Sequence, residues 1–476
     1  MAEKEYHKDM SGLFGVVSHN DCVKDLFYGT DYHSHLGTQK AGLAVWNKKL
    51  RRSIHKLGGV QFKSKFAAEV SEWQGNMGIG VISDLESQPV IVYSRFGLLA
   101  LVGTGLVANK KQLVEKMVLK GESFSEFSGG EVNTLELAGK IILGEKNFKK
   151  GLEKLFAEIK GSLSLLILTS KGIYAVRDIN GRSTLALGQK KGSLAVASES
   201  CAFPNLGFTF TSELKPGEVI FLDKNGIQKI TQFKNEQKYC AFSWIYTGYP
   251  ASTYNGVSVE EVRERSGANL AKKDLKEGLK ADLVAGIPDS GVAYAIGYAQ
   301  EAKIPLRRVL IKYTPGYGRS FLPLSKEERD QIAQKKLLPV PALIAGKKIV
   351  ICDDSIVRGT QLRNQVIDRL WEYGAAEIHL RIGCPPLLFA CPYFLSTRTT
   401  TELAARRAIT EAHLSSKPTS AFIKESPFYR RMVERIAQSL GVTSLVYQSI
   451  DEMVEAICLP AESLCLYCWQ GEKDKK

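Results

Sequence analysis

The sequence lacks any apolar run long enough to span a membrane, and its first ten residues are too polar and charged for a secretory signal peptide. It has too few acidic residues to balance the basic ones, which gives a formal net charge of +14. The Lys and Arg residues are spread out, however, and no nucleic-acid-binding motif accompanies them. Nine cysteines, an odd number, argue against a disulfide framework. We therefore expect a cytoplasmic protein that binds neither a membrane nor nucleic acid.

The 476 residues suffice for two or three domains with buried cores. Between residues 11 and 235, short strand patterns and a few helix patterns follow one another without regular alternation, which predicts a layered α+β domain. A polar linker at Phe233–Lys238 ends this region. From residue 255 onward strands alternate with helices, as at Val259–Glu277 (helix) and Asp282–Gly286 (strand). Residues 236–476 should therefore form an α/β domain with a doubly wound parallel sheet.

The most informative stretch of the chain is Lys347–Thr360. Its apolar run Ile349–Ile351 is typical of a strand buried in a parallel sheet, and Asp353 and Asp354 follow at the carboxyl end of that strand. A short polar loop then opens a helix pattern at Gln361–Tyr373. In open α/β sheets ligands bind at the carboxyl ends of strands, and the N–H groups at a helix start suit a phosphate. Because two carboxylates would repel that phosphate, we expect them to bind sugar hydroxyls or Mg²⁺.

This stretch resembles the 5-phosphoribosyl-1-pyrophosphate (PRPP) loop of type I phosphoribosyltransferases, in the version found in glutamine PRPP amidotransferases. The match runs through eight consecutive residues, whereas a bare acidic pair would indicate only a solvated strand end. The resemblance implies that Asp353 and Asp354 are catalytic residues that hold the ribose hydroxyls and Mg²⁺. It assigns the 5′-phosphate of PRPP to the residues that follow, which are Ser355, Ile356, Val357, Arg358, Gly359 and Thr360.

The turn after the expected strand at Asp282–Gly286 resembles the pyrophosphate loop of the same family. Read alone, its proline, aspartate, serine and glycine are an ordinary turn signal, but their place upstream of the acidic pair adds weight to the match. Backbone amides in such a turn can bind a diphosphate. The resemblance therefore implies that Pro288, Asp289 and Ser290 bind the diphosphate and that Ser290 also contacts the metal.

The segment Lys312–Phe321 resembles the flexible flap that closes over PRPP in this family. It carries one extra residue, and Thr314 stands where the family has an Arg. The resemblance makes Lys312 and Arg319 catalytic residues that contact the pyrophosphate. A basic lid would also exclude water from the oxocarbenium-like centre of phosphoribosyl transfer. The alternative interpretation of this segment is a basic surface loop.

Residues 11–235 resemble the glutaminase domain of these amidotransferases, which has the amino-terminal-nucleophile (Ntn) hydrolase fold. The resemblance rests on matching segments at Ser11–Gly15, Gly75–Gly80, Arg177–Gly181, Ala197–Phe203 and Lys215–Glu218. The ten residues ahead of Ser11 have the length of the family's cleaved propeptide. Residues 1–10 are therefore expected to be a propeptide-like leader.

The residues of the family's glutaminase site are replaced in this chain. Ser11 stands in place of the terminal Cys nucleophile, Ser83 in place of the Arg that clamps the glutamine carboxylate, and Thr104 in place of the oxyanion-hole Asn. Asn133 stands where an Asp holds the glutamine amine, and Leu36 replaces an Arg. A terminal Ser is a nucleophile in related folds, so the change at residue 11 alone does not decide whether the site is active. The nucleophile, the carboxylate clamp and the oxyanion donor are replaced together, and the loss of one oxyanion donor alone lowers the rate by about 10²–10³-fold. We expect a retained fold with an inactive glutaminase site.

Cys465 and Cys468 form a C-x-x-C motif, which alone is compatible with a redox pair, half of a zinc site or part of an iron–sulfur site. In the iron–sulfur branch of the family, four cysteines hold a [4Fe–4S] cluster, and this chain has a cysteine at each position: Cys240, Cys391, Cys465 and Cys468. The resemblance implies a cluster that ties the carboxyl tail to the transferase domain. The alternative is a zinc site of four cysteines.

Over nearly the whole chain, the resemblance implies an enzyme that transfers a phosphoribosyl group from PRPP to ammonia or another amine, as in purine biosynthesis. It further implies that the enzyme depends on Mg²⁺, forms a homo-oligomer and has no glutaminase activity of its own. A separate glutaminase subunit is then a candidate source of ammonia. Three features favour an alternative function: the altered flap, and Tyr249 and Ala251, which stand where the family has Arg and Asp. In that alternative the chain is a non-catalytic paralogue that binds PRPP or nucleotides and regulates a partner.

Overall fold

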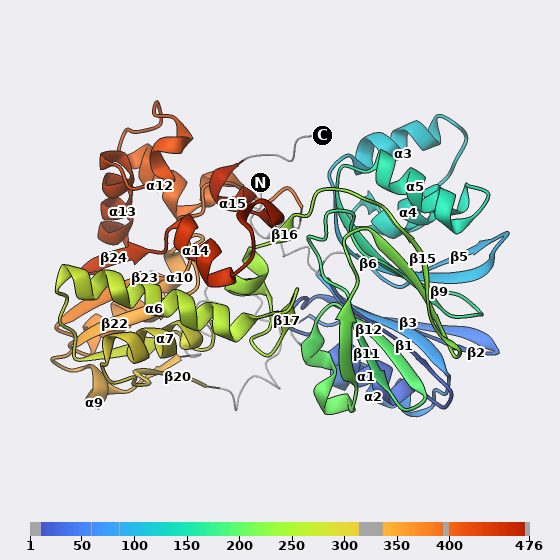
Figure 1. Cartoon of the computed structure of the whole chain (residues 1–476), viewed down its shortest axis with the longest axis horizontal. Coiled ribbons are helices and arrows are strands. Elements are labelled where there is room, and N and C mark those ends of the chain that lie inside the picture. Colours follow the sequence, from blue (N-terminus) through green and yellow to red (C-terminus); the bar gives the residue numbers. More distant parts are fainter. Residues whose placement is uncertain (1–10, 59, 85, 314–336, 394–398, 472–476) are drawn as a thin grey trace. The chain divides into compact units, whose positions relative to one another are not determined.

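The computed structural model describes residues 11–58, 60–84, 86–313, 337–393 and 399–471 (Figure 1). These residues form two compact units, which are described separately. Unit 1 comprises the described residues up to Cys240, together with Ser252–Asn255 and residues 391–393. Unit 2 comprises Ala241–Ala251, Gly256–Ala390 and the described residues from 399 onward. Within the described ranges, no helix has the length and apolar character needed to cross a membrane.

Unit 1 is built on two antiparallel sheets that pack face to face. The first has seven strands, in the order β13 (Thr209–Glu213), β11 (Ala186–Lys190), β12 (Ser193–Ala197), β1 (Ser11–Ser18), β4 (Met77–Ser83), β2 (Lys40–Asn47) and β3 (Lys49–Lys56). The second has six, in the order β15 (Gly226–Gln232), β14 (Glu218–Asp223), β10 (Ile173–Val176), β9 (Gly161–Leu168), β6 (Gly97–Val107) and β5 (Val90–Ser94).

Helices cover the outer face of each sheet, so unit 1 has four layers. The first sheet is covered by α1 (Val23–Asp31) and α2 (Phe62–Ser71). The second sheet is covered by α3 (Lys110–Val118), α4 (Thr134–Leu143) and α5 (Phe148–Glu158). Unit 1 has one apolar core beneath each of these two groups of helices and another core between the two sheets. This layered arrangement confirms the α+β prediction for the first part of the chain.

Alternation of side chains along β1 and β4 explains how these layers pack. Leu13 and Val17 of β1 face the core between the sheets, whereas Phe14 and Val16 face α1 and α2. On β4, Gly80 leaves room for α1, because a Cβ atom there would lie 2.0 Å from the Thr30 hydroxyl oxygen. The glycines in this strand therefore allow a close helix–sheet contact.

Unit 2 contains a four-stranded parallel sheet with the order β19 (Leu283–Gly286), β22 (Lys348–Asp353), β23 (Glu377–Ile382) and β24 (Ser444–Tyr447). On the opposite side of β19, Leu306 forms a parallel bridge with Val284. The connection after β19 thus leads one way along the sheet and the connection after β22 leads the other way. The strands β19 and β22 therefore flank a topological switch point, where α/β proteins bind ligands.

Helices pack on both faces of this sheet. On one face, α6 (Val259–Glu277) and α7 (Val292–Ala302) lie against each other and against β19 and β22 (Figure 1). The other elements of unit 2 include α10 (Thr360–Leu362), η4 (Arg363–Ile367), α11 (Asp368–Glu372), α12 (Ala404–Glu411), α13 (Pro427–Leu440), α14 (Ile450–Ile457), α15 (Tyr467–Gln470) and the antiparallel pair β20 (Leu310–Lys312) and β21 (Leu337–Pro339).

Two sequence predictions in unit 2 are confirmed closely. Helix α6 has the predicted bounds, since the Ser258 side chain accepts a hydrogen bond from the N–H of Glu261 at its start and Gly278 ends it at a φ of 75°. The helix expected at Gln361–Tyr373 is present as the run from α10 to α11, although its middle is wound as a π-helix. These signals are local, which is why the sequence carries them.

Candidate functional site

The loops after β19 and β22 meet at the carboxyl edge of the unit 2 sheet. Asp353 ends β22 and Asp354 follows it; the two residues are buried, with exposed fractions of 9% and 4%. From the loop after β19, the Ser290 hydroxyl donates a hydrogen bond to the Asp353 carboxylate, with 2.6 Å between Oγ and Oδ1. The structure therefore brings three of the predicted site residues together at the switch point.

The loop after β19 fits tightly against β22 because it contains a glycine at the point of contact. The N–H of Ile287 donates to the carbonyl oxygen of Cys352 at 3.0 Å. The N–H of Gly291 donates to the Ile287 carbonyl at 2.8 Å and closes the turn. A Cβ atom on Gly291 would lie only 2.0 Å from the Cys352 carbonyl oxygen. Glycine at this position thus allows the approach that holds Ser290 beside Asp353.

The acidic pair carries an electrostatic cost in the absence of a cation. Burial raises the pKa of Asp353 well above its ordinary value, and the neighbouring charge of Asp354 raises it further. Burial also raises the pKa of Asp354, although the Ser355 hydroxyl and the Arg263 guanidinium act in the opposite direction. A divalent cation would offset the repulsion between the two carboxylates.

The two carboxylates and the Ser290 hydroxyl offer the oxygen ligands that hard cations such as Mg²⁺ bind. The described residues hold no group of three or more His, Cys, Asp or Glu side chains suited to a metal. Mg²⁺ commonly takes only one or two protein carboxylates, however, and completes its shell with waters and substrate phosphates. Two carboxylates beside one hydroxyl suit that mode of binding.

Residues 355–360 form the turn between β22 and the following helical run. The Ser355 hydroxyl donates to the Asp354 carboxylate, which ties the turn to the acidic pair. Gly359 has a φ of 77°, in the left-handed region that favours glycine, and helix α10 begins directly after it at Thr360. The predicted phosphate residues therefore lie at a helix start, next to the acidic pair.

The predicted basic residues of the site are partly paired. The Lys312 ammonium lies 2.8 Å from the Asp289 carboxylate, so the first residue of the expected flap contacts the turn after β19. Arg358 is exposed and pairs with Glu402 at 2.6 Å, so its charge is already balanced by a carboxylate. Arg319 lies outside the described residues.

The four predicted cluster cysteines divide between the units, with Cys240 and Cys391 in unit 1 and Cys465 and Cys468 in unit 2. Cys391 and Cys468 are buried. The carbonyl oxygen of Cys468 accepts hydrogen bonds from the backbone N–H groups of residues 388 and 389 at 3.0 and 3.1 Å, which attaches helix α15 to that segment. A cluster ligated by all four cysteines stays a prediction.

In unit 1, the residues at the altered glutaminase positions lie together. Ser11 pairs with Ser83 on the neighbouring strands β1 and β4, and the N–H of Ser11 donates to the Thr104 hydroxyl at 3.1 Å. All three residues are buried. Asn133 has a structural use, because its side-chain oxygen accepts the N–H of Leu135 at 2.9 Å and caps α4. Hydroxyls at positions 11, 83 and 104 provide neither a guanidinium nor a side-chain amide.

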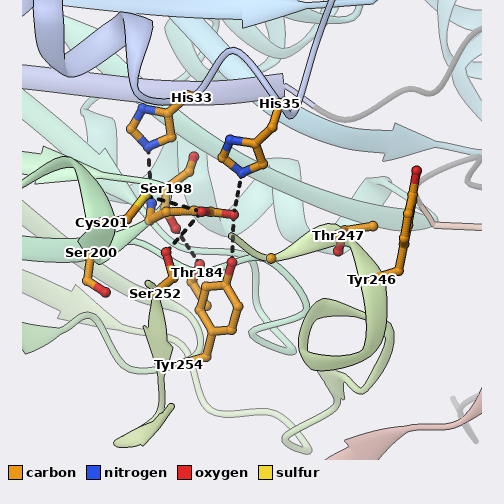
Figure 2. Close-up of polar contacts among 12 residues, drawn as sticks. His33, His35, Thr184, Ser198, Ser200, Cys201, Tyr246, Thr247, Ser252 and Tyr254 are labelled. Carbon is orange, nitrogen blue, oxygen red and sulfur yellow. Dashed lines mark hydrogen bonds and ion pairs between the residues drawn. The ribbon is translucent and has the colours of Figure 1, made fainter. Parts of the chain in front are cut away.

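Sequence reasoning gave no role to two buried charged residues, Arg263 and Glu199. Arg263 of α6 donates to three backbone carbonyls of the segment before it, those of Trp244, Tyr246 and Gly248. Glu199 lies in a segment that matches the family, and its carboxylate accepts hydrogen bonds from residues far away in the sequence (Figure 2). The surrounding sequence does not reveal such distant partners, since Arg263 lies among other charged residues and Glu199 lies between two serines.

Comparisons with known proteins agree with this architecture. Residues 76–205 match a family described as a glutamine amidotransferase domain. An amidophosphoribosyltransferase of Methanocaldococcus jannaschii is 30% identical over 97% of each chain. An amidophosphoribosyltransferase of Bacillus subtilis is 29% identical and covers 99% of this chain and 95% of its own length.

A solved structure extends this likeness to three dimensions. The glutamine PRPP amidotransferase from B. subtilis, complexed with ADP and GMP, has a TM-score of 0.84 and 29% identity, covering 98% of this chain and 97% of its own. This likeness confirms both predicted fold classes. The chain has an Ntn-hydrolase-type glutaminase-like domain followed by a type I phosphoribosyltransferase domain with a doubly wound parallel sheet.

Proposed function

Since this chain belongs to the amidophosphoribosyltransferase family of pentosyltransferase enzymes, we propose that it transfers a phosphoribosyl group from PRPP to ammonia or another amine without a glutaminase activity of its own. The observation that carries the transferase part is the meeting of the two loops at the switch point. There the Ser290 hydroxyl contacts Asp353, Asp354 follows, and a helix start lies a few residues further on.

Each part of PRPP has a proposed place at this edge. Asp353 and Asp354 bind the ribose hydroxyls, and Mg²⁺ held by them and by Ser290 would supply charge neutralisation for the diphosphate. The diphosphate lies on the turn Pro288–Ser290. The 5′-phosphate lies on residues 355–360, where N–H groups at the helix start favour an anion.

The proposed reaction is a displacement at C1 of the ribose. The bond between C1 and the pyrophosphate oxygen breaks, the amine nitrogen forms a bond to C1 and then loses a proton, and pyrophosphate leaves with the electron pair. Lys312 and Arg319 would meet the leaving pyrophosphate. The ion pair between Lys312 and Asp289 supports this assignment, because it puts a cation beside the turn proposed for the diphosphate.

The absence of glutaminase activity is proposed from the altered residues of unit 1. The matched domain family and the B. subtilis structure are both named for glutamine, so this part of the proposal distinguishes the chain from them. Ser11, Ser83 and Thr104 lie together and offer only hydroxyl groups. A carboxylate clamp and an amide oxyanion donor are thus missing at these positions.

We also propose that Cys240, Cys391, Cys465 and Cys468 bind a [4Fe–4S] cluster. What supports this is the sequence alone, since all four cysteine positions of the iron–sulfur branch are present; among the described residues no three of these cysteines form a group suited to a metal. The division into 11–235 and 236–476, a homo-oligomer, a cytoplasmic location and a separate ammonia source stay predictions from the sequence.

Pyrophosphate release from PRPP and Mg²⁺ tests the transferase part. We expect release with ammonium salts, and its loss in the double variant Asp353→Asn with Asp354→Asn. The matched control is Asp368→Asn, which removes a half-exposed carboxylate that pairs with Arg363 on the following helical run. PRPP binding without release on any amine would favour the regulatory alternative. An active double variant would refute the assignment of the acidic pair.

A further inference from the structure

The turn proposed for the 5′-phosphate, residues 355–360, is contacted by helix α12. Two of its carbonyl oxygens accept hydrogen bonds from this helix. The N–H of Ala404 donates to the Val357 carbonyl at 2.7 Å, and the Arg407 guanidinium donates to the Arg358 carbonyl. The turn and α12 both belong to unit 2, so these contacts lie within one compact unit.

The two donors lie on the same side of α12, because residues three positions apart are neighbours on a helix surface. Ala404 is the first residue of α12, so its N–H has no acceptor within its own helix. The Val357 carbonyl supplies that acceptor. The start of α12 is thus satisfied by the turn, and the turn is held at two successive peptide groups.

Holding these two carbonyls also sets the direction of two N–H groups. Both peptide groups are trans, and in a trans peptide group the C=O and the N–H of the next residue point in opposite directions. The N–H groups of Arg358 and Gly359 therefore point away from α12. Among the described residues, no backbone carbonyl accepts a hydrogen bond from either of them. Successive N–H groups with a common direction form a donor set that binds anions such as phosphate.

The charges beside the turn differ in how they are paired. The Arg358 guanidinium lies 2.6 Å from the carboxylate of Glu402, the last residue of η5 (Thr400–Glu402) before α12. The Arg407 guanidinium contacts a neutral carbonyl oxygen, and no carboxylate of the described residues pairs with it. Arg407 therefore carries the positive charge beside the turn that remains for an anion.

Helix α12 is itself fixed to other parts of unit 2. It lies beside α13 (Figure 1), where Glu411 pairs with Arg435 at 2.9 Å. The Arg406 guanidinium donates to a backbone carbonyl of the segment after β23 at 2.6 Å. Helix α13 also holds the helical run after the turn, because the Arg363 guanidinium donates to a carbonyl near the end of α13 at 2.9 Å. The turn is thus supported from both α12 and α13.

The turn needs this support because one of its peptide groups is followed by glycine. Rotation of the peptide group between Arg358 and Gly359 would change the φ of Gly359, which is 77°. Glycine adopts positive and negative φ about equally well, so steric contacts of its own backbone do not prevent that rotation. A rotated peptide group would present its carbonyl oxygen to the phosphate in place of the N–H. The hydrogen bond from Arg407 opposes this rotation, because it holds the carbonyl on the α12 side.

We propose that Arg407 is a positioning residue for the 5′-phosphate of PRPP. By holding the Arg358 carbonyl, it keeps the N–H of Gly359 directed at the phosphate, and its charge favours the anion at the turn. This inference rests on the function proposed above, because that function places the 5′-phosphate on residues 355–360. It adds a residue that lies 49 positions after Arg358 in the chain.

Binding of two fragments of PRPP tests the proposal without turnover. Ribose 5-phosphate carries the 5′-phosphate, whereas Mg²⁺–pyrophosphate is assigned to the turn after β19. Arg407→Met keeps the length of the side chain and removes its charge and its donors. Calorimetry of this variant should show ribose 5-phosphate binding weakened about tenfold, because a hydrogen bond from a charged group is lost. Its affinity for Mg²⁺–pyrophosphate should stay unchanged, which also shows that the sheet edge is folded.

Arg430→Met is the matched control, since it removes the same charge from an exposed position of α13 and should change neither affinity. Unchanged ribose 5-phosphate binding in Arg407→Met, or equal weakening in the control, would overturn the positioning role. Equal weakening of both ligands in Arg407→Met would also refute it, because the contact would then support the fold in general.

Kinetics of pyrophosphate release extend this test to the reaction. In Arg407→Met the KM for PRPP should rise about tenfold while the KM for ammonia stays unchanged, whereas loss of folded protein would lower kcat and leave both KM values unchanged. An unchanged KM for PRPP would contradict the positioning role. Binding of neither fragment by the unmodified chain would instead refute the proposed function.

Discussion

Replacing Gly291 by alanine tests whether the turn after β19 must lie against β22 for the proposed reaction. The new Cβ atom would lie 2.0 Å from the Cys352 carbonyl oxygen, whereas Cβ atoms essentially never come closer than 3.0 Å to such an atom. The turn must therefore move by at least about 1 Å, and a displacement of that size at a reacting centre costs about 10²-fold in rate. Overpacking should also lower the free energy of unfolding by roughly 1–3 kcal/mol.

The assay compares pyrophosphate release and thermal unfolding of Gly291→Ala with those of the unmodified chain. Gly139→Ala serves as the control, because its Cβ atom would make ordinary contacts of 3.5 and 3.6 Å within unit 1. We expect the control to keep its activity and Gly291→Ala to lose about two orders of magnitude in kcat/KM. An active Gly291→Ala with normal stability would mean that the position of Ser290 beside Asp353 is not needed.

Acid and metal analyses provide two further predictions. Burial lowers the pKa of His33 from its ordinary value of 6.5 to about 4 in the folded chain. As the pH falls, the unfolded chain therefore binds a proton at this histidine before the folded chain does, and the free energy of unfolding decreases between pH 6.5 and pH 4. The free energy of unfolding measured in urea should fall by roughly 3 kcal/mol over this pH range, and an unchanged value from pH 6.5 to pH 4 would contradict the prediction. Anaerobically purified protein should be brown, with about four irons per chain. Cys468→Ser should lose the iron and Cys458→Ser, at an exposed position, should keep it; a colourless protein with stoichiometric zinc would contradict the cluster.

Local signals were sufficient for the transferase half of the fold. The apolar run at Ile349–Ile351 is buried in a parallel sheet, as predicted, because a strand covered on both faces needs apolar residues at successive positions. Helix α6 is marked by its capping serine and its terminal glycine. The turn at residues 288–291 is an ordinary turn signal when read alone, but because it and the acidic pair each follow a strand of a parallel sheet, both were expected at the carboxyl ends of the strands, where ligands bind.

Long-range contacts of single charged residues could not be predicted in this way. Glu199 receives hydrogen bonds from residues 53 and 55 positions later in the chain, and no periodicity or spacing connects them. The pairing of Arg358 with Glu402 was missed for the same reason. Asn133 was assigned to an altered glutamine site, yet its side chain also caps α4, a local use that its place before a helix pattern indicates.

The most direct test of the central claim is a comparison of nitrogen donors in one assay. Pyrophosphate and glutamate would be measured together, with PRPP, Mg²⁺ and either an ammonium salt or glutamine. We predict pyrophosphate release with the ammonium salt and no glutamate from glutamine, in the unmodified chain and in Ser11→Cys alike, because Ser83 and Thr104 still lack a carboxylate clamp and an amide donor. Glutamate release by the unmodified chain, or no pyrophosphate with any amine, would contradict the account.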